Sequence, residues 1–413
     1  ELVVVQWDKE ALEVAGLVKI DLLGLRMLSA IAEVEQLITG LTGRSPRLDR
    51  LTFDDPAVYE MIGRADTLGV FQVESRAQAQ ILPRLEPRCF EDLIVTISLI
   101  RPGPIQGNMV HPYLRRRLGQ EPVTYLNPRL ESALAETLGV ILFQEQVLKV
   151  ARDLAGFTPG QGELLRRALG SKYGDAEIAR LKDTFITGAQ ANGVPLDIAE
   201  KVFGQLQAFG GYSFAKSHAA AFAVLVYQSA WLKRYYPATL YIGLFNNWPM
   251  GFWPPSVLLG DARRHDITVL PVDLHHSQAK CSLEGEAIRL GFNYVAGLGE
   301  SGGARLVTAR QAGPFRDLAD LCRRTHLPRR LVEQLILAGR WMVGARLVAN
   351  CCGHWANSPT GPRNCHWTIP PKPWTCRYCR HLRLWPGSGT FWGCPLASMC
   401  SPSIGPGWLS RAF

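Results

Sequence analysis

Apolar residues recur at helical spacing over most of the chain. In residues 22–40, side chains such as Leu25, Leu28 and Ile31 lie three positions apart, which predicts an amphipathic helix. The same spacing recurs in the segments 130–138, 144–154, 162–169, 175–192, 196–209 and 219–235. We therefore predict helices from residue 127 to about residue 241, with a break at Gly210 and Gly211, and short helices over residues 294–338.

A few short segments have the pattern of strands. Residues 16–21 alternate loosely and end in a carboxylate, as a strand that delivers Asp21 at its end would. Residues 69–73 predict a strand or an extended segment, and residues 267–272 and 287–291 predict strands on either side of a turn. The pattern as a whole predicts an α+β protein that is predominantly α-helical.

Prolines and glycines mark where these elements stop. Asp55 before Pro56 predicts a helix start, because proline is favoured in the first helical turn. Residues 101–104 contain two prolines and a glycine, which excludes both a helix and a strand ladder. Residues 248–255 contain three prolines and predict a rigid, turn-rich connector.

Length and composition bound the class of protein. The 413 residues allow two to four domains, and 47% hydrophobic with 20% charged residues fit a globular protein. No run of 18 or more apolar residues occurs, which predicts no membrane span. The chain begins with glutamate and lacks the pattern of a signal peptide, so we expect a truncated N-terminus.

The net charge of +9 is concentrated in residues 340–413, which hold eight Lys or Arg and no Asp or Glu. The remaining 37 basic and 36 acidic residues of 1–339 nearly cancel, so a nucleic-acid interface has to rest on local clusters. Seven of the ten cysteines also lie in 340–413, whereas 1–339 has the cysteine content of a reducing, cytoplasmic protein.

Asp21 is a candidate metal ligand. It follows a strand-like segment and lies close to Gly24, and a carboxylate at a strand end can hold Mg²⁺ with little side-chain motion. Phosphoryl transfer through two metal ions needs several such carboxylates together. The alternative is that Asp21 only caps the helix that follows it.

Two basic segments are candidate phosphate sites. Arg166 and Arg167 are adjacent on a predicted helix and point about 100° apart, so that they can hold one anion from two sides, with Lys172 nearby. The alternative is a solvated helix face. Lys216, Ser217 and His218 follow Gly210–Gly211 at a predicted helix start, a position that favours phosphate. A Ser–His nucleophile is disfavoured there, since the two residues are adjacent and no Gly-x-Ser-x-Gly elbow is present.

A Gly-Leu-Gly turn at residues 297–299 is a candidate DNA contact. Gly297 and Gly299 allow a turn that exposes backbone N–H groups to a DNA phosphate, as in a helix-hairpin-helix, and Arg305 adds charge. The alternative is an ordinary turn between two helices.

Several segments in family order resemble the bacterial DNA polymerase III alpha subunits, the C-family DNA polymerases. They are residues 16–26, 69–76, 101–104, 143–147, 164–172, 210–219, 246–252, 261–265 and 296–300. The resemblance implies that Asp21 is the third catalytic aspartate, although no Asp-x-Asp motif precedes it here. It also implies that Arg166, Arg167, Lys172, Lys216, Ser217 and His218 hold a nucleotide triphosphate, and that Arg101, Gly297, Gly299 and Arg305 contact DNA.

The resemblance further implies an activity and a domain order. A primer 3′-hydroxyl would attack a deoxynucleoside triphosphate with two Mg²⁺ ions, of which this chain supplies only the ligand Asp21, so we expect the chain to be inactive alone. We expect the end of a palm in residues 1–50, fingers in 51–245, a connector and helix-hairpin-helix region in 246–339, and an irregular tail in 340–413. Primer-template DNA, nucleotides, a sliding clamp and other replisome subunits are the implied partners. Residues 246–252 resemble both the replicative and the error-prone paralogues. The alternative is a non-catalytic DNA-binding remnant or a pseudogene product.

The tail from residue 340 departs from the family pattern. Relatives continue after Leu-Ile-x-Ala-Gly with Ala-Met-Asp or Ala-Phe-Asp, whereas this chain has Arg340, Trp341 and Met342. Trp and Met have the single codons TGG and ATG. Joined as TGGATG, they contain GAT, an Asp codon, in a shifted reading frame. We therefore predict a frame-shifted tail that is disordered. Cys376 and Cys379 form a single C-x-x-C with irregular partners, so we expect no zinc site there.

Overall fold

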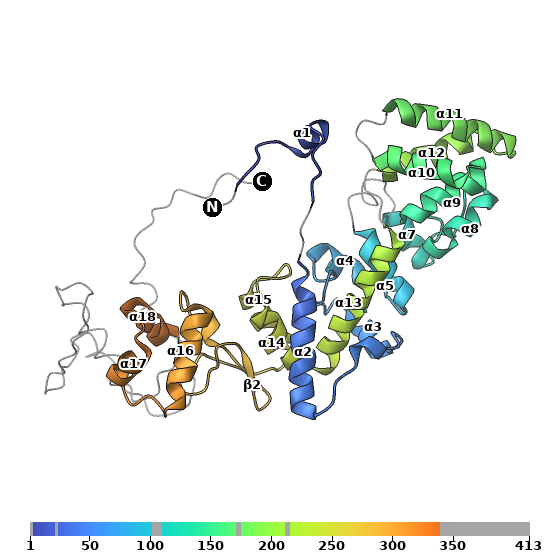
Figure 1. Cartoon of the computed structure of the whole chain (residues 1–413). Coiled ribbons are helices and arrows are strands. Elements are labelled where there is room, and N and C mark those ends of the chain that lie inside the picture. Colours follow the sequence, from blue (N-terminus) through green and yellow to red (C-terminus); the bar gives the residue numbers. More distant parts are fainter. Residues whose placement is uncertain (1–2, 21–23, 101–109, 171–174, 211–214, 339–413) are drawn as a thin grey trace, which may run out of the picture. The chain divides into compact units, whose positions relative to one another are not determined.

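A computed structural model describes residues 3–20, 24–100, 110–170, 175–210 and 215–338, which fold mainly into helices (Figure 1). These residues belong to one compact unit, Glu1–Arg340. The predicted α+β class, predominantly α, is thereby confirmed. The predicted sites at Asp21, Arg101 and Lys172 and the tail predicted to be frame-shifted lie outside the described residues.

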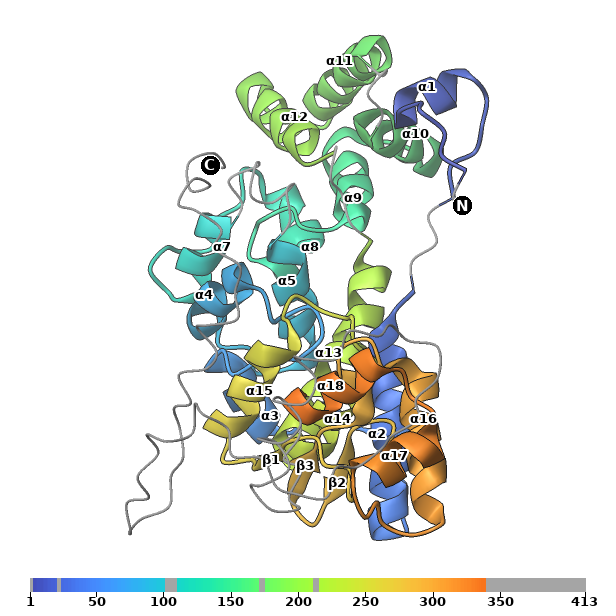
Figure 2. The same cartoon turned by 90° about the vertical axis from the view of Figure 1, so that its left-hand side faces the viewer.

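The first long helix, α2 (Arg26–Thr42), packs against α14 (Pro237–Asn246), and Figure 2 shows the two side by side. The apolar spacing of α2 buries one face, formed by Met27, Ala30, Ile31, Val34 and Ile38. Gly243 permits the close approach, because a Cβ atom there would lie 2.4 Å from Val34 Cγ2 and 3.0 Å from the Ala30 carbonyl oxygen. Any larger residue at 243 would force the two helices apart.

The segment before α2 differs from its prediction. The short helix α1 (Lys9–Val14) precedes residues 16–20, which form no strand, and Leu17, Val18 and Ile20 are exposed. An apolar alternation needs a neighbouring strand for its backbone hydrogen bonds, and the described residues offer none here. The predicted strand is therefore wrong for the part of this segment that the structure describes.

The next helices surround α13 (Lys216–Tyr235). They are α3 (Pro56–Gly63), α4 (Arg76–Leu85), α5 (Phe90–Leu99) and α7 (Val110–Arg117), after the 3₁₀ turn η1 (Leu48–Arg50). Asp55 caps α3 as predicted, since its carboxylate accepts a hydrogen bond from the Ala57 N–H at 2.9 Å. Helix α13 packs on α5 and α3. Residues 69–72 form turns rather than the predicted strand, and the Phe71 N–H donates to Ser229 Oγ of α13 at 3.2 Å.

A second group of helices lies between α7 and α13 in the chain. It comprises η2 (Pro128–Leu130), α8 (Glu131–Leu134), η3 (Ala135–Thr137), α9 (Gln144–Ala155), α10 (Pro159–Gly170), α11 (Asp175–Ala191) and α12 (Leu196–Gly210). The start of α9 is organised by the buried Gln146, whose Oε1 accepts from the Leu142 and Phe143 N–H groups at 2.8 and 3.0 Å. The predicted helices of this region are confirmed.

After α14 the chain forms α15 (Pro255–Arg264) and a three-stranded sheet of order β1-β3-β2. Strands β1 (Val269–Leu270) and β3 (Ala287–Arg289) are parallel, with Val269 opposite Ile288, and β2 (Ser282–Glu284) pairs with β3 antiparallel. The turn η4 (Phe292–Tyr294) then leads to α16 (Gly299–Gln311), α17 (Leu318–Thr325) and α18 (Arg329–Ala338). The predicted strands and short helices of this region are confirmed.

Asn246, at the end of α14, links three of these elements. Its Nδ2 donates to Glu33 Oε1 of α2 at 2.7 Å and to the Cys281 carbonyl at 3.0 Å, and its Oδ1 accepts from the Cys281 N–H at 2.8 Å. The neighbouring Asn247 donates to the other oxygen of Glu33 at 2.8 Å. The two asparagines therefore hold α2, α14 and the start of β2 together.

No described helix combines the length and the apolar character that crossing a bilayer requires.

Candidate nucleotide and DNA sites

Arg166 and Arg167 of α10 share one carboxylate. Glu163 accepts from Arg166 Nε at 2.8 Å and from Arg166 Nη2 at 2.7 Å, and its Oε1 also accepts from Arg167 Nε at 3.0 Å. These hydrogen bonds lower the pKa of Glu163 to about 2. Arg166 is held more firmly, since its side chain is 30% exposed against 72% for Arg167. The pair lies partly open to solvent, as an anion site requires.

Lys216 begins α13 and has two acidic partners. Its ammonium forms an ion pair with Glu136 of η3 and lies 5.8 Å from the centre of the Phe143 ring. Its backbone N–H donates to both oxygens of Glu145, at 3.1 and 3.2 Å. Glu145 thus occupies the N-terminus of α13, which lacks a capping side chain of its own.

Glu145 also connects the two basic segments. The hydrogen bonds that Arg166 donates to Glu163 raise the pKa of Arg166, and the charge of Glu145 adds to that rise. Glu145 therefore bonds Lys216, 71 positions away in the chain, and its charge also acts on Arg166. Ser217 and His218 are exposed on the first turn of α13, and the His218 ring packs on Phe222 at 4.2 Å between ring centres. The structure brings Arg166 and Lys216 into one cluster, as a shared nucleotide site would need; Asp21, Arg101 and Lys172 are not described.

The sequence analysis overlooked the acidic half of this cluster. Glu163 could have been found, because it lies three and four positions before the arginines on one helix, where ion pairs form. Glu136 is 80 positions from Lys216, and no spacing in the sequence indicates that pair.

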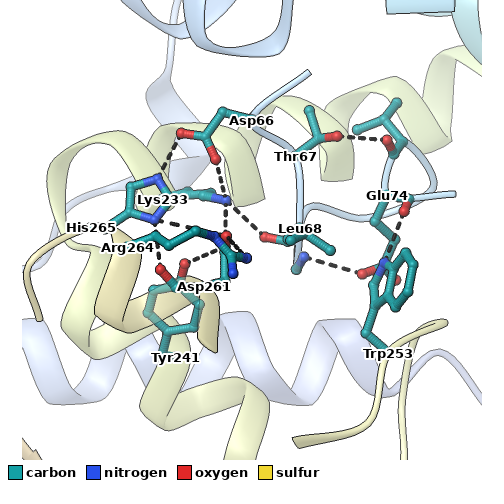
Figure 3. A network of polar contacts seen from close by, with 12 residues as sticks. Asp66, Thr67, Leu68, Glu74, Lys233, Tyr241, Trp253, Asp261, Arg264 and His265 are labelled. Carbon is teal, nitrogen blue, oxygen red and sulfur yellow. Dashed lines mark hydrogen bonds and ion pairs between the residues drawn. The ribbon is translucent and has the colours of Figure 1, made fainter. Parts of the chain in front are cut away.

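A second polar cluster surrounds Lys233, which is buried where α13, α14 and α15 meet (Figure 3). Its ammonium lies 2.7 Å from Asp66 Oδ1, 3.0 Å from Asp261 Oδ2 and 3.0 Å from the Leu68 carbonyl, so all three of its protons have acceptors. The Tyr241 hydroxyl donates to Asp261 Oδ2 at 2.6 Å. Burial would raise the pKa of Asp261, but the charge of Lys233 and hydrogen bonds from Tyr241 outweigh it and leave that pKa low. We call these residues, with Arg264 and His265, the Lys233 cluster.

His265 is a cation in this cluster. Its Nδ1 lies 2.9 Å from the Asp261 carbonyl and its Nε2 lies 2.7 Å from Asp66 Oδ2. Both partners can only accept, so both ring nitrogens carry a proton. Burial would lower the pKa of His265, but these hydrogen bonds raise it above its ordinary value.

Asp66, Asp261 and His265 could at first sight hold a metal ion, because one ligand atom from each lies within 4.8 Å of the others. Two observations argue against it. The Lys233 ammonium, which contacts both carboxylates, and the His265 imidazolium already supply two positive charges for them. Neither ring nitrogen of His265 has a free lone pair, which a metal bond requires. The geometry fits a structural ion-pair cluster better than a metal centre.

Glu74, also shown in Figure 3, attaches the turn-rich connector to the turn at residues 69–73. Its buried carboxylate accepts from the Gly69 and Phe252 N–H groups, each at 3.1 Å, and Trp253 Nε1 donates to its carbonyl at 2.9 Å. Burial raises the pKa of Glu74. The predicted turn-rich connector is thus bound to the turn at residues 69–73.

The Gly-Leu-Gly turn at 297–299 has the backbone form that its sequence predicts. Gly297 and Gly299 have φ values of +77° and +64°, which favour glycine. Helix α16 starts at Gly299 without a capping side chain, and a Cβ atom at Gly299 would meet nothing within 4 Å. An anion can therefore approach the first N–H groups of α16.

The arginines near this turn are engaged in the structure. Arg305 donates to the Thr325 carbonyl and, at 3.1 Å, to the His326 carbonyl, so that it holds the C-terminus of α17. Arg310 donates to the Leu274 and Ser277 carbonyls at 3.1 and 2.8 Å. The predicted DNA contact of Arg305 stays a prediction, since its guanidinium has a structural role here.

Comparison with known proteins finds family matches for two regions of the chain, one in its first half and one near residue 300. Residues 27–193 match the family described as bacterial DNA polymerase III alpha subunit finger domain, and residues 266–342 match the helix-hairpin-helix motif. The molecule is therefore of the class in which helical polymerase fingers precede a helix-hairpin-helix module.

Full-length relatives share this sequence at high identity. An error-prone DNA polymerase of Alkalilimnicola ehrlichii is 49% identical over 353 residues, which are 84% of this chain and 34% of that protein. An error-prone DNA polymerase of Pseudomonas aeruginosa is 46% identical over 371 residues (88% and 36%), and one of Corynebacterium glutamicum is 48% identical over 337 residues (81% and 32%). The chain thus contains a finger region of the bacterial DNA polymerase III alpha kind and spans about a third of the length of the curated relatives it matches.

The comparisons leave the expected domain limits as predictions. The finger match begins at residue 27, within the segment 1–50 that we expected to belong to a palm. The Pseudomonas aeruginosa match covers more of the chain than residues 1–339 contain, so it includes part of the segment that we predicted to be frame-shifted. The frame shift likewise stays a prediction.

Proposed function

We propose that this chain supplies the nucleotide-binding fingers and a DNA-binding hairpin of a template-directed DNA polymerase that carries out error-prone synthesis. The high identity to relatives that are named error-prone DNA polymerases supports this proposal. The single observation that carries it is the cluster of Arg166, Arg167 and Lys216, which joins two basic segments far apart in the chain.

In this proposal the triphosphate of an incoming nucleotide binds across α10 and the start of α13. Arg166 and Arg167 offer planar guanidinium groups for phosphate oxygens, and Lys216 offers a point charge beside them. Ser217 and His218 lie on the exposed first turn of α13, within the same helix N-terminus. Lys172 completes the set by family resemblance and lies outside the described residues.

Primer-template DNA is the second proposed ligand. The backbone N–H groups from Gly297 to the start of α16 suit a phosphate without reading a base. The resemblance adds Arg101 and Arg305, and it adds a sliding clamp and other replisome subunits as partners in the cytoplasm.

The chemistry proposed for the whole polymerase is nucleotidyl transfer to a primer 3′-hydroxyl. Mg²⁺ would stabilise the attacking and leaving oxygens when bound. Asp21 is its proposed ligand in this chain, and the Lys233 cluster does not fit that role because Lys233 and His265 already neutralise its two carboxylates. We propose that the chain is catalytically incomplete alone.

The test is to measure binding and catalysis separately on the 413-residue chain. Titration with dATP, followed by calorimetry, should show binding that Arg166→Ala and Lys216→Ala each weaken by about three- to ten-fold. Primer extension with Mg²⁺ and all four nucleotides should be absent. Robust extension would refute the catalytic incompleteness, and unchanged dATP binding in both variants would refute the nucleotide site.

A matched pair of glycines tests the DNA hairpin. Gly299 and Gly285 have similar φ values, +64° and +62°, and both have open space where a side chain would go. Aspartate tolerates this backbone conformation, so Gly299→Asp should weaken DNA binding about three- to ten-fold, whereas Gly285→Asp should not. Fluorescence anisotropy with labelled primer-template DNA at fixed salt measures both, and equal losses would argue against the hairpin contact.

A second candidate function is a DNA-binding module without a role in catalysis. The observation that favours it is that Arg166, Arg167 and Lys216 are all paired with carboxylates in the structure. DNA binding without any dATP binding would support this second candidate.

A further inference from the structure

The described cations of the candidate nucleotide site all have carboxylates as partners or neighbours. Arg166 and Arg167 bond Glu163, and Lys216 pairs with Glu136 and donates its backbone N–H to Glu145. A nucleotide triphosphate brings several negative charges, which favour a site with free positive charge. A carboxylate that neutralises one of these cations therefore opposes the binding of a triphosphate.

The carboxylates differ in the element that carries them. Glu163 lies on α10 together with both arginines, and it stays beside them however α10 moves. Toward the two arginines, Glu163 accepts from the Nε and Nη2 atoms of Arg166 and from Nε of Arg167, so the Nη1 groups of both are not used in these hydrogen bonds. A phosphate and Glu163 can thus bind the same guanidinium at different edges, so Glu163 fits the role of a positioning residue.

Glu136 stands in a different relation to its cation. It belongs to η3, whereas Lys216 begins α13, and the two are 80 positions apart. An ammonium group carries one compact charge on three donors, and Glu136 neutralises that charge whichever donor it accepts from. Glu136 and a phosphate oxygen therefore compete for the charge of Lys216. The Lys216 and Glu136 side chains are 40% and 35% exposed, which allows the pair to open into solvent.

We propose that Glu136 is an internal competitor of the nucleotide: it neutralises Lys216 in the nucleotide-free state and is exchanged for a phosphate oxygen on binding. This inference rests on the proposed function, because it concerns the same site. The exchange breaks one ion pair and forms another, with no covalent step. Glu136 then sets the affinity of the site, whereas Glu163 keeps its arginines in place before and after the exchange.

The test compares Glu136→Gln with Glu163→Gln in the full 413-residue chain. Both changes remove one negative charge from the same cluster, at side chains that are 35% and 37% exposed. A general electrostatic effect would therefore raise the affinity for an anion in both variants. Our inference predicts opposite signs: Glu136→Gln binds inorganic triphosphate roughly two- to five-fold more tightly, the range for one exposed ion pair, and Glu163→Gln binds it more weakly.

Isothermal calorimetry with inorganic triphosphate and with dATP at fixed ionic strength measures the affinities, and circular dichroism melting verifies that each variant is folded. Lys216→Met in the Glu136→Gln background should remove the gain. Binding by the unaltered chain with equal or weaker binding by Glu136→Gln overturns the inference alone. Absence of binding in both overturns the inference together with the nucleotide site, and binding by Glu136→Gln only supports it.

Discussion

The Lys233 cluster and the candidate nucleotide site use the same chemical groups in opposite surroundings. Lys233 is 1% exposed and has a carbonyl and two carboxylates around it, whereas the Lys216 side chain is 40% exposed and its ammonium pairs with one carboxylate. Exposed ion pairs contribute little to stability and exchange partners readily, while removal of one partner from a buried pair is costly. The contrast shows that buried ion pairs join the elements of the chain, whereas the exposed pairs are suited to the exchange of partners that our proposed nucleotide site requires.

The largest expected effect separates the two lysines. Lys233→Met keeps the length of the side chain but removes the buried cation that Asp66 and Asp261 share, so that only the more exposed His265 and Arg264 still pair with them. It should lower the free energy of unfolding by about 3 kcal/mol. Lys216→Met should change it by less than about 1 kcal/mol. Urea denaturation followed by circular dichroism measures both, and similar losses at the two positions would contradict the contrast.

A pair of tyrosines sharpens the comparison at the level of one hydrogen bond. Tyr241 and Tyr235 each donate to an aspartate oxygen at 2.6 Å, but Tyr241 is fully buried and Tyr235 is 44% exposed. Tyr241→Phe should lower the free energy of unfolding by about 1.5–3 kcal/mol, the range for a hydrogen bond to a charged group. Tyr235→Phe should cost less than about 0.5 kcal/mol, because water replaces its partner. The same denaturation experiment distinguishes them, and a larger loss at Tyr235 would count against our assignment.

The smallest expected effect is a dependence of stability on pH through His265. Its folded-state pKa is raised above the ordinary value, so the stability it adds is fully present below about pH 6.5 and is lost as pH rises through the folded-state pKa. The groups that face it are Asp66, Asp261, Lys233, Arg264 and Tyr241, and none of them titrates ordinarily between pH 6 and 8.

Because the His265 side chain is partly exposed, the change should be less than about 1 kcal/mol. Thermal unfolding of the unaltered chain and of His265→Gln at pH 6, 7 and 8 isolates it as a difference between the two proteins. A stability difference that grows with rising pH would have the wrong sign for a doubly protonated His265.

The fold was largely predictable from sequence because helices are local. The spacing of α2, the cap at Asp55 and the strands around residue 280 all follow from neighbours within a few positions. Residues 16–20 show where prediction from local sequence fails: the alternating pattern predicts a strand but does not indicate whether a partner strand is present.

Of the residues in the candidate nucleotide site, only the positively charged ones were predicted from the sequence. Arg166 and Lys216 lie in recognisable segments, and Glu163 has a helical spacing to the arginines that indicates a pair. Asp66 and His265, by contrast, are 199 positions apart and meet only in three dimensions. Buried polar clusters depend on such long-range contacts, so a pattern of single residues does not indicate them.

Asn246 also limits how the sheet can be extended. The backbone N–H groups of Ile288 and Leu290 donate to Thr268 and Leu270, on the β1 side. The backbone N–H and C=O groups of residues 287 and 289 therefore face β2. By the same alternation, the N–H and C=O groups of Cys281 point away from β3, to the outer edge of the sheet. The Asn246 amide accepts from one of these outward groups and donates to the other, as a neighbouring strand would. The Asn246 side chain therefore takes the place of a neighbouring strand at Cys281. A strand from another chain could pair with this edge at Cys281 only by displacing the Asn246 amide.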